Sequence, residues 1–167
     1  MKTLLSRVKK LHDSFFHLVS FAQTPFLLIV RLYWGSWLIE NGWAKLHNLG
    51  NVMEYFTSLG LPMPGPTAVF ISSLEFFGGI LLVLGLFSRV ISLMLTINLV
   101  TAYITADREA LLSIFSDRDK FTAAAPFTFL FASLVVLIFG AGKISADGLL
   151  GRWLFPADAR GTPSAQN

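Results

Sequence analysis

The sequence has no cysteine and only three histidines among its 167 residues. The missing cysteine excludes disulfides, thiol redox chemistry, iron–sulfur clusters and thiolate metal sites. The histidines are scattered at His12, His17 and His47, with no cluster of carboxylates around them. We therefore expect no metal site.

Charged residues are also scarce, at 14% of the chain, against about a quarter in a soluble domain. Hydrophobic residues make up 54%, 16 residues are phenylalanine, and the mean hydropathy is +0.64. This composition is typical of a protein whose solvent is lipid. The net charge of +3 does not indicate nucleic acid, because the basic residues flank apolar runs, as they do in proteins that contact a bilayer.

Four apolar runs are long enough to be membrane spans, which need about 20 helical residues to cross about 30 Å of hydrocarbon. They lie at about 25–46, 67–87, 90–106 and 123–142. The sequence thus predicts an all-α fold, an integral membrane four-helix bundle that occupies residues 25–155 as one domain.

The remaining segments carry other signals. Residues 1–24 are basic and amphipathic, and they predict either a short helix on the membrane surface or the first turns of the first span, with Pro25 as a kink. Apolar residues at helical spacing in NVMEYFTSLG predict a short surface helix in the first loop. A solvated loop is predicted at residues 107–122, which carry both signs of charge. Only Ser88 and Arg89 separate the second and third spans, which predicts a tight turn. The composition of residues 156–167 predicts a disordered tail.

The lysines and arginines outside the spans predict an orientation. If the N-terminus is cytoplasmic, eight of them fall on the inner side and four on the outer side. Cytoplasmic segments carry the excess of basic residues in membrane proteins. The sequence therefore predicts that both termini are cytoplasmic and that the longer loops face outward.

Four of the polar side chains inside the predicted spans stand out: Arg31, Glu40, Glu75 and Asn98. Ionisable groups at membrane depth are costly and are usually paired or functional. We expect these four to form an inward-facing cluster in which Arg31 pairs with Glu75, since each would otherwise be an unpaired charge in a low dielectric. Three roles fit such a cluster: a structural pair that fixes helix register, a ligand or quinone headgroup site, and a proton or ion path.

Small residues recur beside these polar groups. Together with the polar groups they form one stripe on each of the first two spans. The stripe on the first span comprises Arg31, Gly35, Leu38, Gly42 and Lys45, and the stripe on the second comprises Ser72, Glu75 and Gly79. Such stripes let helices approach closely, and they would also permit a homodimer. At the ends of the spans, Lys45 and Arg89 are expected to be ordinary interface anchors.

Four segments together resemble the DoxX family of small bacterial membrane proteins. They are RLYWGSWLIENGWAK (31–45), LGLPMPGP (59–66), LEFFGGILLVLGLFSR (74–89) and GAGKISAD (140–147). The positions that carry the resemblance are Arg31, Gly35, Gly42, Lys45, Glu75, Gly79, Gly85, Arg89, Gly142, Ser145 and Asp147. The resemblance covers about residues 25–147.

The resemblance implies a four-helix, multi-pass protein of the bacterial inner membrane with a link to redox biology. Our interpretation is a membrane or quinone-docking subunit of a redox or oxidative-stress system that works with a partner oxidoreductase subunit. No intrinsic cofactor is evident, and the lack of cysteine means that a redox role needs a bound quinone or a partner's cofactor. In this interpretation Arg31 and Glu75 orient a quinone carbonyl, Asn98 adds a hydrogen bond, and Lys45 meets a partner or an anionic lipid.

Two other functions fit the same sequence. One is a non-enzymatic membrane scaffold that recruits a soluble oxidoreductase through its long outer loops. The other is a transporter of small solutes or protons that depends on Glu75, although the chain has no inverted repeat and no broken helix inside a span. No autonomous catalytic motif is present in the sequence, so any enzymatic activity is expected to be that of a subunit of a quinone-linked oxidoreductase.

Overall fold

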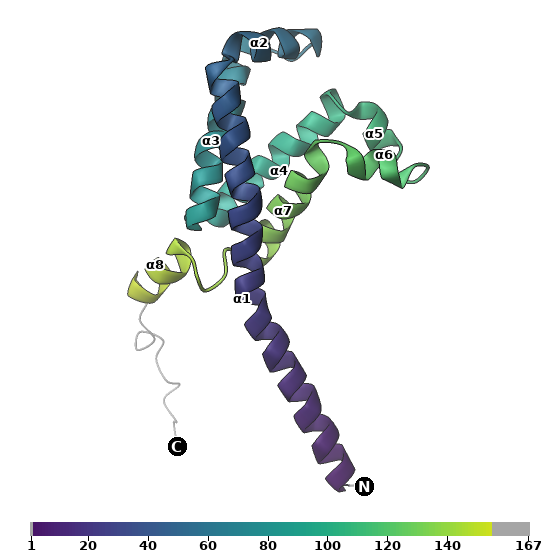
Figure 1. The fold of residues 1–167 in the computed structure, drawn as a ribbon, viewed down its shortest axis with the longest axis vertical. Coiled ribbons are helices and arrows are strands. Elements are labelled where there is room, and N and C mark those ends of the chain that lie inside the picture. Colours follow the sequence, from purple (N-terminus) through teal and green to yellow (C-terminus); the bar gives the residue numbers. More distant parts are fainter. Residues whose placement is uncertain (1, 155–167) are drawn as a thin grey trace, which may run out of the picture.

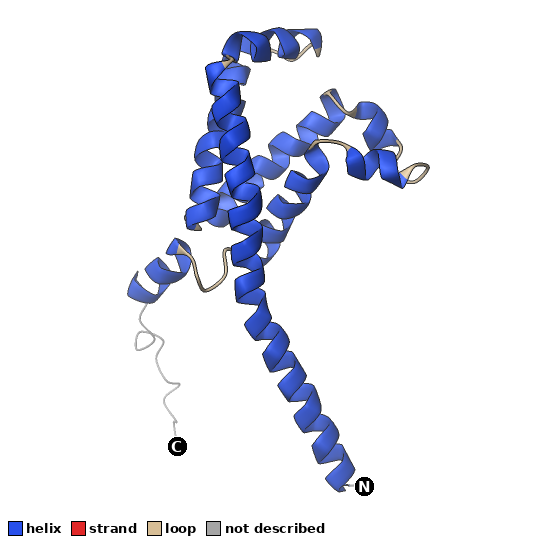
Figure 2. Ribbon diagram, viewed as in Figure 1, coloured by secondary structure: helices blue, strands red, loops and turns tan. Residues whose placement is uncertain are grey.

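The computed structural model of the chain describes residues 2–154, and over that range it contains helices and no strands (Figures 1 and 2). The helices are α1 (Lys2–His47), α2 (Leu49–Ser58), α3 (Pro64–Leu84), α4 (Ser88–Thr105), α5 (Arg108–Leu112), α6 (Arg118–Ala123), α7 (Pro126–Phe139) and α8 (Ala146–Leu154). The predicted all-α membrane four-helix bundle is confirmed, with α1, α3, α4 and α7 as its helices. α2 is the short helix predicted in the first loop. The predicted disordered tail at 156–167 lies outside the described residues.

Three of the four bundle helices, α1, α3 and α4, are long and apolar enough to cross a membrane. The fourth differs from the prediction of a span over 123–142, because α7 has only 14 residues, or about 21 Å of helix against about 30 Å of hydrocarbon. It begins at Pro126, whose missing N–H costs nothing in a first helical turn. It ends before Gly140, where φ 77 and ψ −171 leave the helical region.

The turn between α3 and α4 lies at residues 85–87 rather than at the two residues predicted. Gly85 has a φ of 70, a left-handed conformation that glycine adopts without steric cost. The N–H of Leu86 then donates to the carbonyl of Leu81 at 2.9 Å, which closes α3 with a Schellman cap. α3 also starts three residues earlier than predicted, because Pro64 and Pro66 are both tolerated in its first turn.

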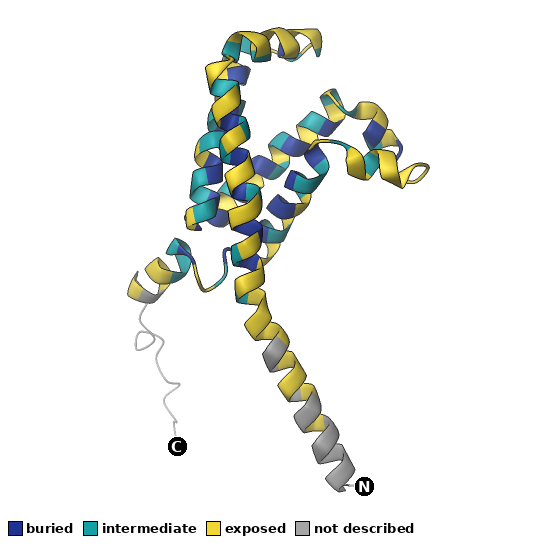
Figure 3. Ribbon diagram, viewed as in Figure 1, coloured by how far each residue is buried: buried dark blue, intermediate teal, exposed yellow. Residues whose placement is uncertain are grey.

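α1 is a single helix of 46 residues that runs through Pro25 without a break. Residues 2–24 are helical and continuous with the first predicted span. The helix is about 69 Å long, more than twice the thickness of the hydrocarbon. Leu27 is 1% exposed, whereas Phe21 before it is 74% exposed. The N-terminal part of α1 extends away from the bundle (Figure 3).

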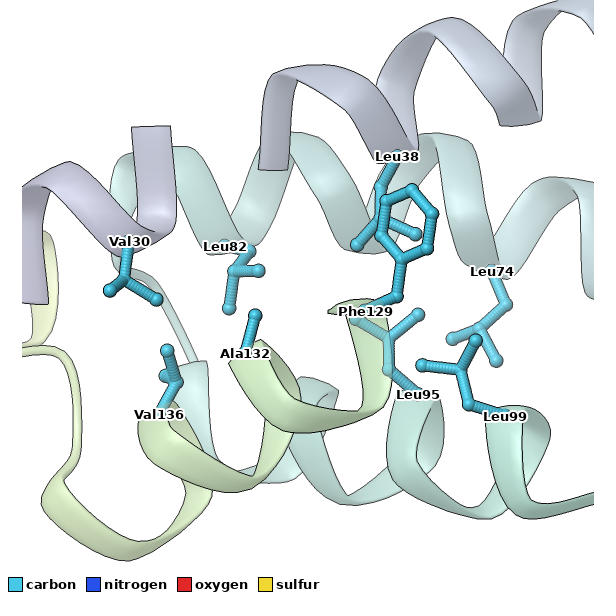
Figure 4. Close-up of a cluster of buried hydrophobic side chains, with 9 residues drawn as sticks. All are labelled: Val30, Leu38, Leu74, Leu82, Leu95, Leu99, Phe129, Ala132 and Val136. Carbon is cyan, nitrogen blue, oxygen red and sulfur yellow. The ribbon is translucent and has the colours of Figure 1, made fainter. Parts of the chain in front are cut away.

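The core of the bundle is one cluster of buried apolar side chains contributed by all four helices (Figure 4). It comprises Val30 and Leu38 of α1, Leu74 and Leu82 of α3, Leu95 and Leu99 of α4, and Phe129, Ala132 and Val136 of α7. α1 lies along α3 and α4 lies along α7. The two pairs diverge toward the end of the bundle that carries α2, α5 and α6 (Figure 1). This divergence sets where a cavity can form.

The closest approach of α1 and α3 depends on Gly42. A Cβ at that position would overlap the backbone nitrogen of Phe76 and would lie 2.9 Å from the carbonyl carbon of Glu75. The predicted stripes therefore pack α1 against α3 within one chain, and Gly35 and Gly79 are in contact along the same interface. Gly42 fixes the register that puts Glu75 beside the last turns of α1.

Residues 107–122, which were predicted to be a loop, contain the short helices α5 and α6. Asp117 starts α6 by accepting a hydrogen bond from the backbone N–H of Lys120 at 3.0 Å. Tyr103 of α4 donates to the carbonyl of Phe121 at 2.8 Å and stacks on its ring. These contacts hold the segment against the end of α4.

Candidate functional site

The two ends of the bundle have different chemistry, and we name them by the helices they carry. The α2 end carries α2, α5 and α6, and the α8 end carries the α3–α4 turn and α8 (Figure 1). The four polar residues that the sequence placed in one cluster are divided between these ends. Arg31 is at the α8 end, Glu75 and Asn98 are toward the α2 end, and Glu40 is exposed on α1.

The predicted Arg31–Glu75 pair is wrong. Arg31 is 1% exposed and donates from its two terminal nitrogens to the backbone carbonyls of Ala141, at 2.6 Å, and Ile144, at 2.9 Å. The distance along α1 explains the error. Gly42 is the residue opposite Glu75, and Arg31 lies eleven residues from Gly42, or about 16 Å along the helix.

Glu75 pairs instead with Lys45. The Lys45 Nζ lies 2.6 Å from both carboxylate oxygens of Glu75. The Glu75 side chain is 7% exposed and that of Lys45 is 37% exposed, so the carboxylate is buried while the ammonium reaches the rim of the bundle. Lys45 was expected to be an interface anchor. Its position one turn after Gly42 on the stripe that faces α3 was the signal for this pair.

A cavity of about 370 Å³ adjoins the Lys45–Glu75 pair at the α2 end, in the space where the two helix pairs diverge. Its walls come from α1, α2, α3, α4 and the first turns of α7. Most of the lining is apolar, for example Leu38, Ile71 and Phe129. Polar groups interrupt this background, and they come from Asn41, Lys45, Tyr55, Thr67, Glu75, Asn98, Thr101, Thr105 and Asp107. Ligand sites in proteins have this character and volumes of about 300–1,000 Å³.

Asn98 lines the cavity from α4, as part of the cluster the sequence predicted. Its side chain is partly exposed and makes no hydrogen bond to any other described residue. The amide has two N–H donors and one carbonyl acceptor. These groups are therefore available to a molecule in the cavity.

The family positions at the α8 end form a network of hydrogen bonds, which we call the structural latch. The carboxylate of Asp147 accepts from the backbone N–H groups of Phe87, at 2.8 Å, and Ser88, at 2.9 Å. The Ser145 hydroxyl donates to the carbonyl of Gly142 at 2.6 Å and accepts from the N–H of Gly148 at 3.0 Å. Asp147 thus caps the start of α4, and Ser145 caps the start of α8.

Gly85 and Arg89 complete this end. A Cβ on Gly85 would overlap the guanidinium of Arg31 and would lie 2.6 Å from the Cβ of Ser145. Arg89 is exposed and lines a shallow cavity of about 550 Å³ together with Lys143 and Asp147. The latch joins the α3–α4 turn to the segment that follows α7. We therefore assign it to stability, and the candidate site is the Lys45–Glu75 pair with its cavity.

Taken together, a bundle of apolar helices with an internal ion pair beside a cavity defines a helical membrane protein with one polar site toward one end. Residues 26–108 match the family described as DoxX, and the chain belongs to that family. The matched range includes Lys45, Glu75 and Asn98.

A relative from Bacillus subtilis (strain 168), named "Putative oxidoreductase CatD", is 29% identical over 83 residues. That match covers 50% of this chain and 60% of the relative, so the similarity extends over only part of each protein. No solved structure matches the chain.

Proposed function

We propose that the protein binds a quinone headgroup in the cavity beside Lys45 and Glu75, as the membrane subunit of a redox or oxidative-stress system. The observation that carries this proposal is an ion pair between a buried carboxylate and a partly exposed ammonium in the wall of a largely apolar cavity of about 370 Å³. In this role the electrons come from a partner oxidoreductase. The name of the Bacillus subtilis relative, which describes an oxidoreductase, points in the same direction.

The polar groups of the cavity fit a quinone ring. A quinone has an apolar ring and two carbonyl oxygens, which only accept hydrogen bonds. Lys45 has three N–H donors, and the two oxygens of Glu75 occupy two of them. The third donor of Lys45 and the amide of Asn98 can each donate to a carbonyl, while Leu38 and Phe129 supply apolar surface for the ring.

Quinone binding to the purified protein in nanodiscs tests this proposal. Isothermal titration with decylubiquinone should give saturable binding to the wild type. The variant Asn98→Ala should bind about fivefold more weakly, the equivalent of one net hydrogen bond of about 1 kcal/mol. Lys45→Met should lose more than that, because a donor that carries a charge contributes more.

The matched control is Asn51→Ala, which changes an exposed asparagine of α2 that does not line the cavity. Its affinity should equal that of the wild type. Absence of saturable binding to the wild type would refute the proposal. Equal affinities of the wild type, Asn98→Ala and Lys45→Met would refute this site while leaving quinone binding in place.

Partner docking through residues 107–122 is a second candidate function, and one observation favours it. Phe115 is 92% exposed and Leu112 is 73% exposed, although they lie among charged residues at the α2 end. Apolar side chains exposed in this way often mark an interaction surface. The double variant Leu112→Ser with Phe115→Ser should abolish co-purification of a partner oxidoreductase and leave quinone binding unchanged. Unchanged co-purification would exclude this segment as the docking surface.

We also propose that the protein lies in the inner membrane with its N-terminus and α8 in the cytoplasm, since both lie toward the same end of the bundle (Figure 1). The natural lack of cysteine permits a direct test with single-cysteine variants. In intact cells with a permeabilised outer membrane, a membrane-impermeant maleimide should label Ser116→Cys. It should label Lys9→Cys only after lysis. The reverse pattern would invert the orientation.

A further inference from the structure

A second cavity lies on the other side of one wall of the candidate site. It is a groove of about 600 Å³ between α3 and α4, lined on its outer side by Pro62, Met63, Phe70, Met94 and Ile97. Four residues line both the groove and the inner cavity: Thr67 and Ile71 of α3, and Asn98 and Thr101 of α4. We call these four residues the α3–α4 wall. One layer of side chains therefore separates the groove from the site that contains Lys45 and Glu75.

The groove faces the surroundings of the bundle, which for a membrane protein are lipid. Met63 is 71% exposed, Phe70 is 57% exposed and Ile97 is 59% exposed. These side chains are apolar, and none of the described residues that line the groove is charged. An extended hydrocarbon chain is the kind of molecule that such a surface accommodates.

No hydrogen bond crosses the α3–α4 wall among the described residues. The Thr67 hydroxyl donates to the carbonyl of Pro62 at 2.9 Å, and the Thr101 hydroxyl donates to the carbonyl of Ile97 at 2.9 Å. Both hydroxyls thus bond to the backbone near their own residues. The third polar member of the wall, Asn98, has no partner among the described residues. Parting α3 from α4 here would break apolar contacts alone, which cost less than an internal hydrogen bond in a lipid environment.

We propose that the α3–α4 wall is a lateral entrance from the bilayer and that the ligand is an amphipathic molecule with a long apolar tail. Its polar headgroup lies in the inner cavity beside Lys45 and Glu75, and its tail passes between α3 and α4 into the groove. Asn98, which belongs to both cavities, donates to the headgroup at the passage. This inference rests on the proposed quinone-binding function, and it adds the substrate class, a quinone with an isoprenoid-type tail, and the route of entry.

Photolabelling in nanodiscs tests where the tail lies. The probe is a ubiquinone analogue whose ten-carbon tail ends in a diazirine, and the adducts are mapped by mass spectrometry. Adducts on the outer groove residues Phe70, Met94 and Ile97, suppressed by excess decylubiquinone, are the expected result. Adducts concentrated on Tyr55 and Leu59, which line the inner cavity alone at the α2 end, would overturn the lateral route.

Reversible cross-linking tests the entrance itself. The double variant Thr67→Cys with Thr101→Cys is treated with a bifunctional methanethiosulfonate, which tethers α3 to α4 across the wall and is released by reduction. Association of decylubiquinone should slow at least tenfold on cross-linking and recover on reduction. The matched reference is the same double variant treated with a monofunctional methanethiosulfonate, which adds comparable bulk to both cysteines without tethering α3 to α4, and the tethered protein should bind at least tenfold more slowly than this reference. An unchanged rate in the tethered protein would overturn the entrance.

These experiments separate the inference from the proposed function. If the probe shows no saturable binding to the wild type, quinone binding fails and the inference fails with it. If binding is saturable and depends on Lys45 but the adducts avoid the groove, only the lateral route is wrong.

Discussion

The two side chains of the Lys45–Glu75 pair differ in burial, so removing one should cost more stability than removing the other. Replacing Lys45 with methionine leaves a carboxylate that is 7% exposed without its cation. Breaking a buried pair in this way costs about 3–5 kcal/mol. Because the Lys45 side chain is 37% exposed, water already reaches the pair, and we expect the lower end of that range, about 3 kcal/mol.

Replacing Glu75 with glutamine should cost less. The ammonium of Lys45 is near the rim of the bundle and can turn outward on its flexible stem when its partner is neutral. We expect a cost of about 1 kcal/mol, close to that of one net hydrogen bond. The double variant, Lys45→Met with Glu75→Gln, should then be about as stable as Glu75→Gln alone. The interaction energy of the double-mutant cycle should thus be about 3 kcal/mol.

The measurement is equilibrium unfolding in mixed micelles by titration with dodecyl sulfate, followed by circular dichroism. Lys120→Met is the matched control, since Lys120 forms an ion pair with Glu109 at 3.0 Å in which the side chains are 47% and 89% exposed. An exposed pair of this kind contributes about 0.2–1 kcal/mol. The reasoning is refuted if Lys45→Met costs no more than Lys120→Met, or if the two site substitutions are additive.

Three other substitutions probe the packing that positions the site. Gly42→Ala should destabilise the fold by about 1–3 kcal/mol in the same titration because the methyl group overlaps α3, whereas Gly50→Ala, which meets open space, should be neutral or stabilising. Arg31→Met should lower the free energy of unfolding by about 2–4 kcal/mol, because two hydrogen bonds from a charged donor are lost. It should also raise the rate of amide exchange over 140–145. The control Arg89→Met, at an exposed position, should change stability by less than about 0.5 kcal/mol. Asp147→Ala should cost about 1 kcal/mol and speed exchange of the two amides that it caps at the start of α4.

Each of these predictions has an outcome that contradicts it. Equal effects of Gly42→Ala and Gly50→Ala would mean that α1 and α3 are not in close contact. Unchanged exchange over 140–145 in Arg31→Met would show that the guanidinium does not hold that segment. Unchanged amide exchange at residues 87 and 88 in Asp147→Ala would show that Asp147 does not cap the start of α4.

Much of the fold could be predicted from local patterns. The apolar runs and the short helix at 49–58 follow from hydropathy and helical spacing. The turn after α3 was predicted at Ser88 and Arg89 but lies at residues 85–87, where Gly85 adopts a positive φ. The length of the fourth helix could not be predicted from hydropathy, because Gly140 and Ala141 are buried beside the bundle without being helical. The carbonyl of Ala141 accepts a hydrogen bond from Arg31, which is 110 residues away in the sequence.

The candidate site was predicted in part. Glu75 stood out because a carboxylate in an apolar span needs a partner, and Asn98 because it is polar near the middle of the third span. The identity of the partner could not be predicted from the composition of the spans. Arg31 and Lys45 lie on the same stripe of α1 and both carry a positive charge. Only the register between α1 and α3 distinguishes them.

The sequence by itself determined the class of this protein. The scarcity of charge and the apolar runs, together with the lack of cysteine, show that the chain lies in lipid. Its spans are helical because every backbone N–H and C=O group must be hydrogen-bonded internally in that environment. The tertiary structure alone decided that Glu75 meets Lys45, that Arg31 binds backbone carbonyls, and that a cavity opens between the diverging helix pairs. Those features depend on how far one helix is displaced along another. That displacement is set by close contacts such as the one at Gly42 and not by the pattern of any single helix.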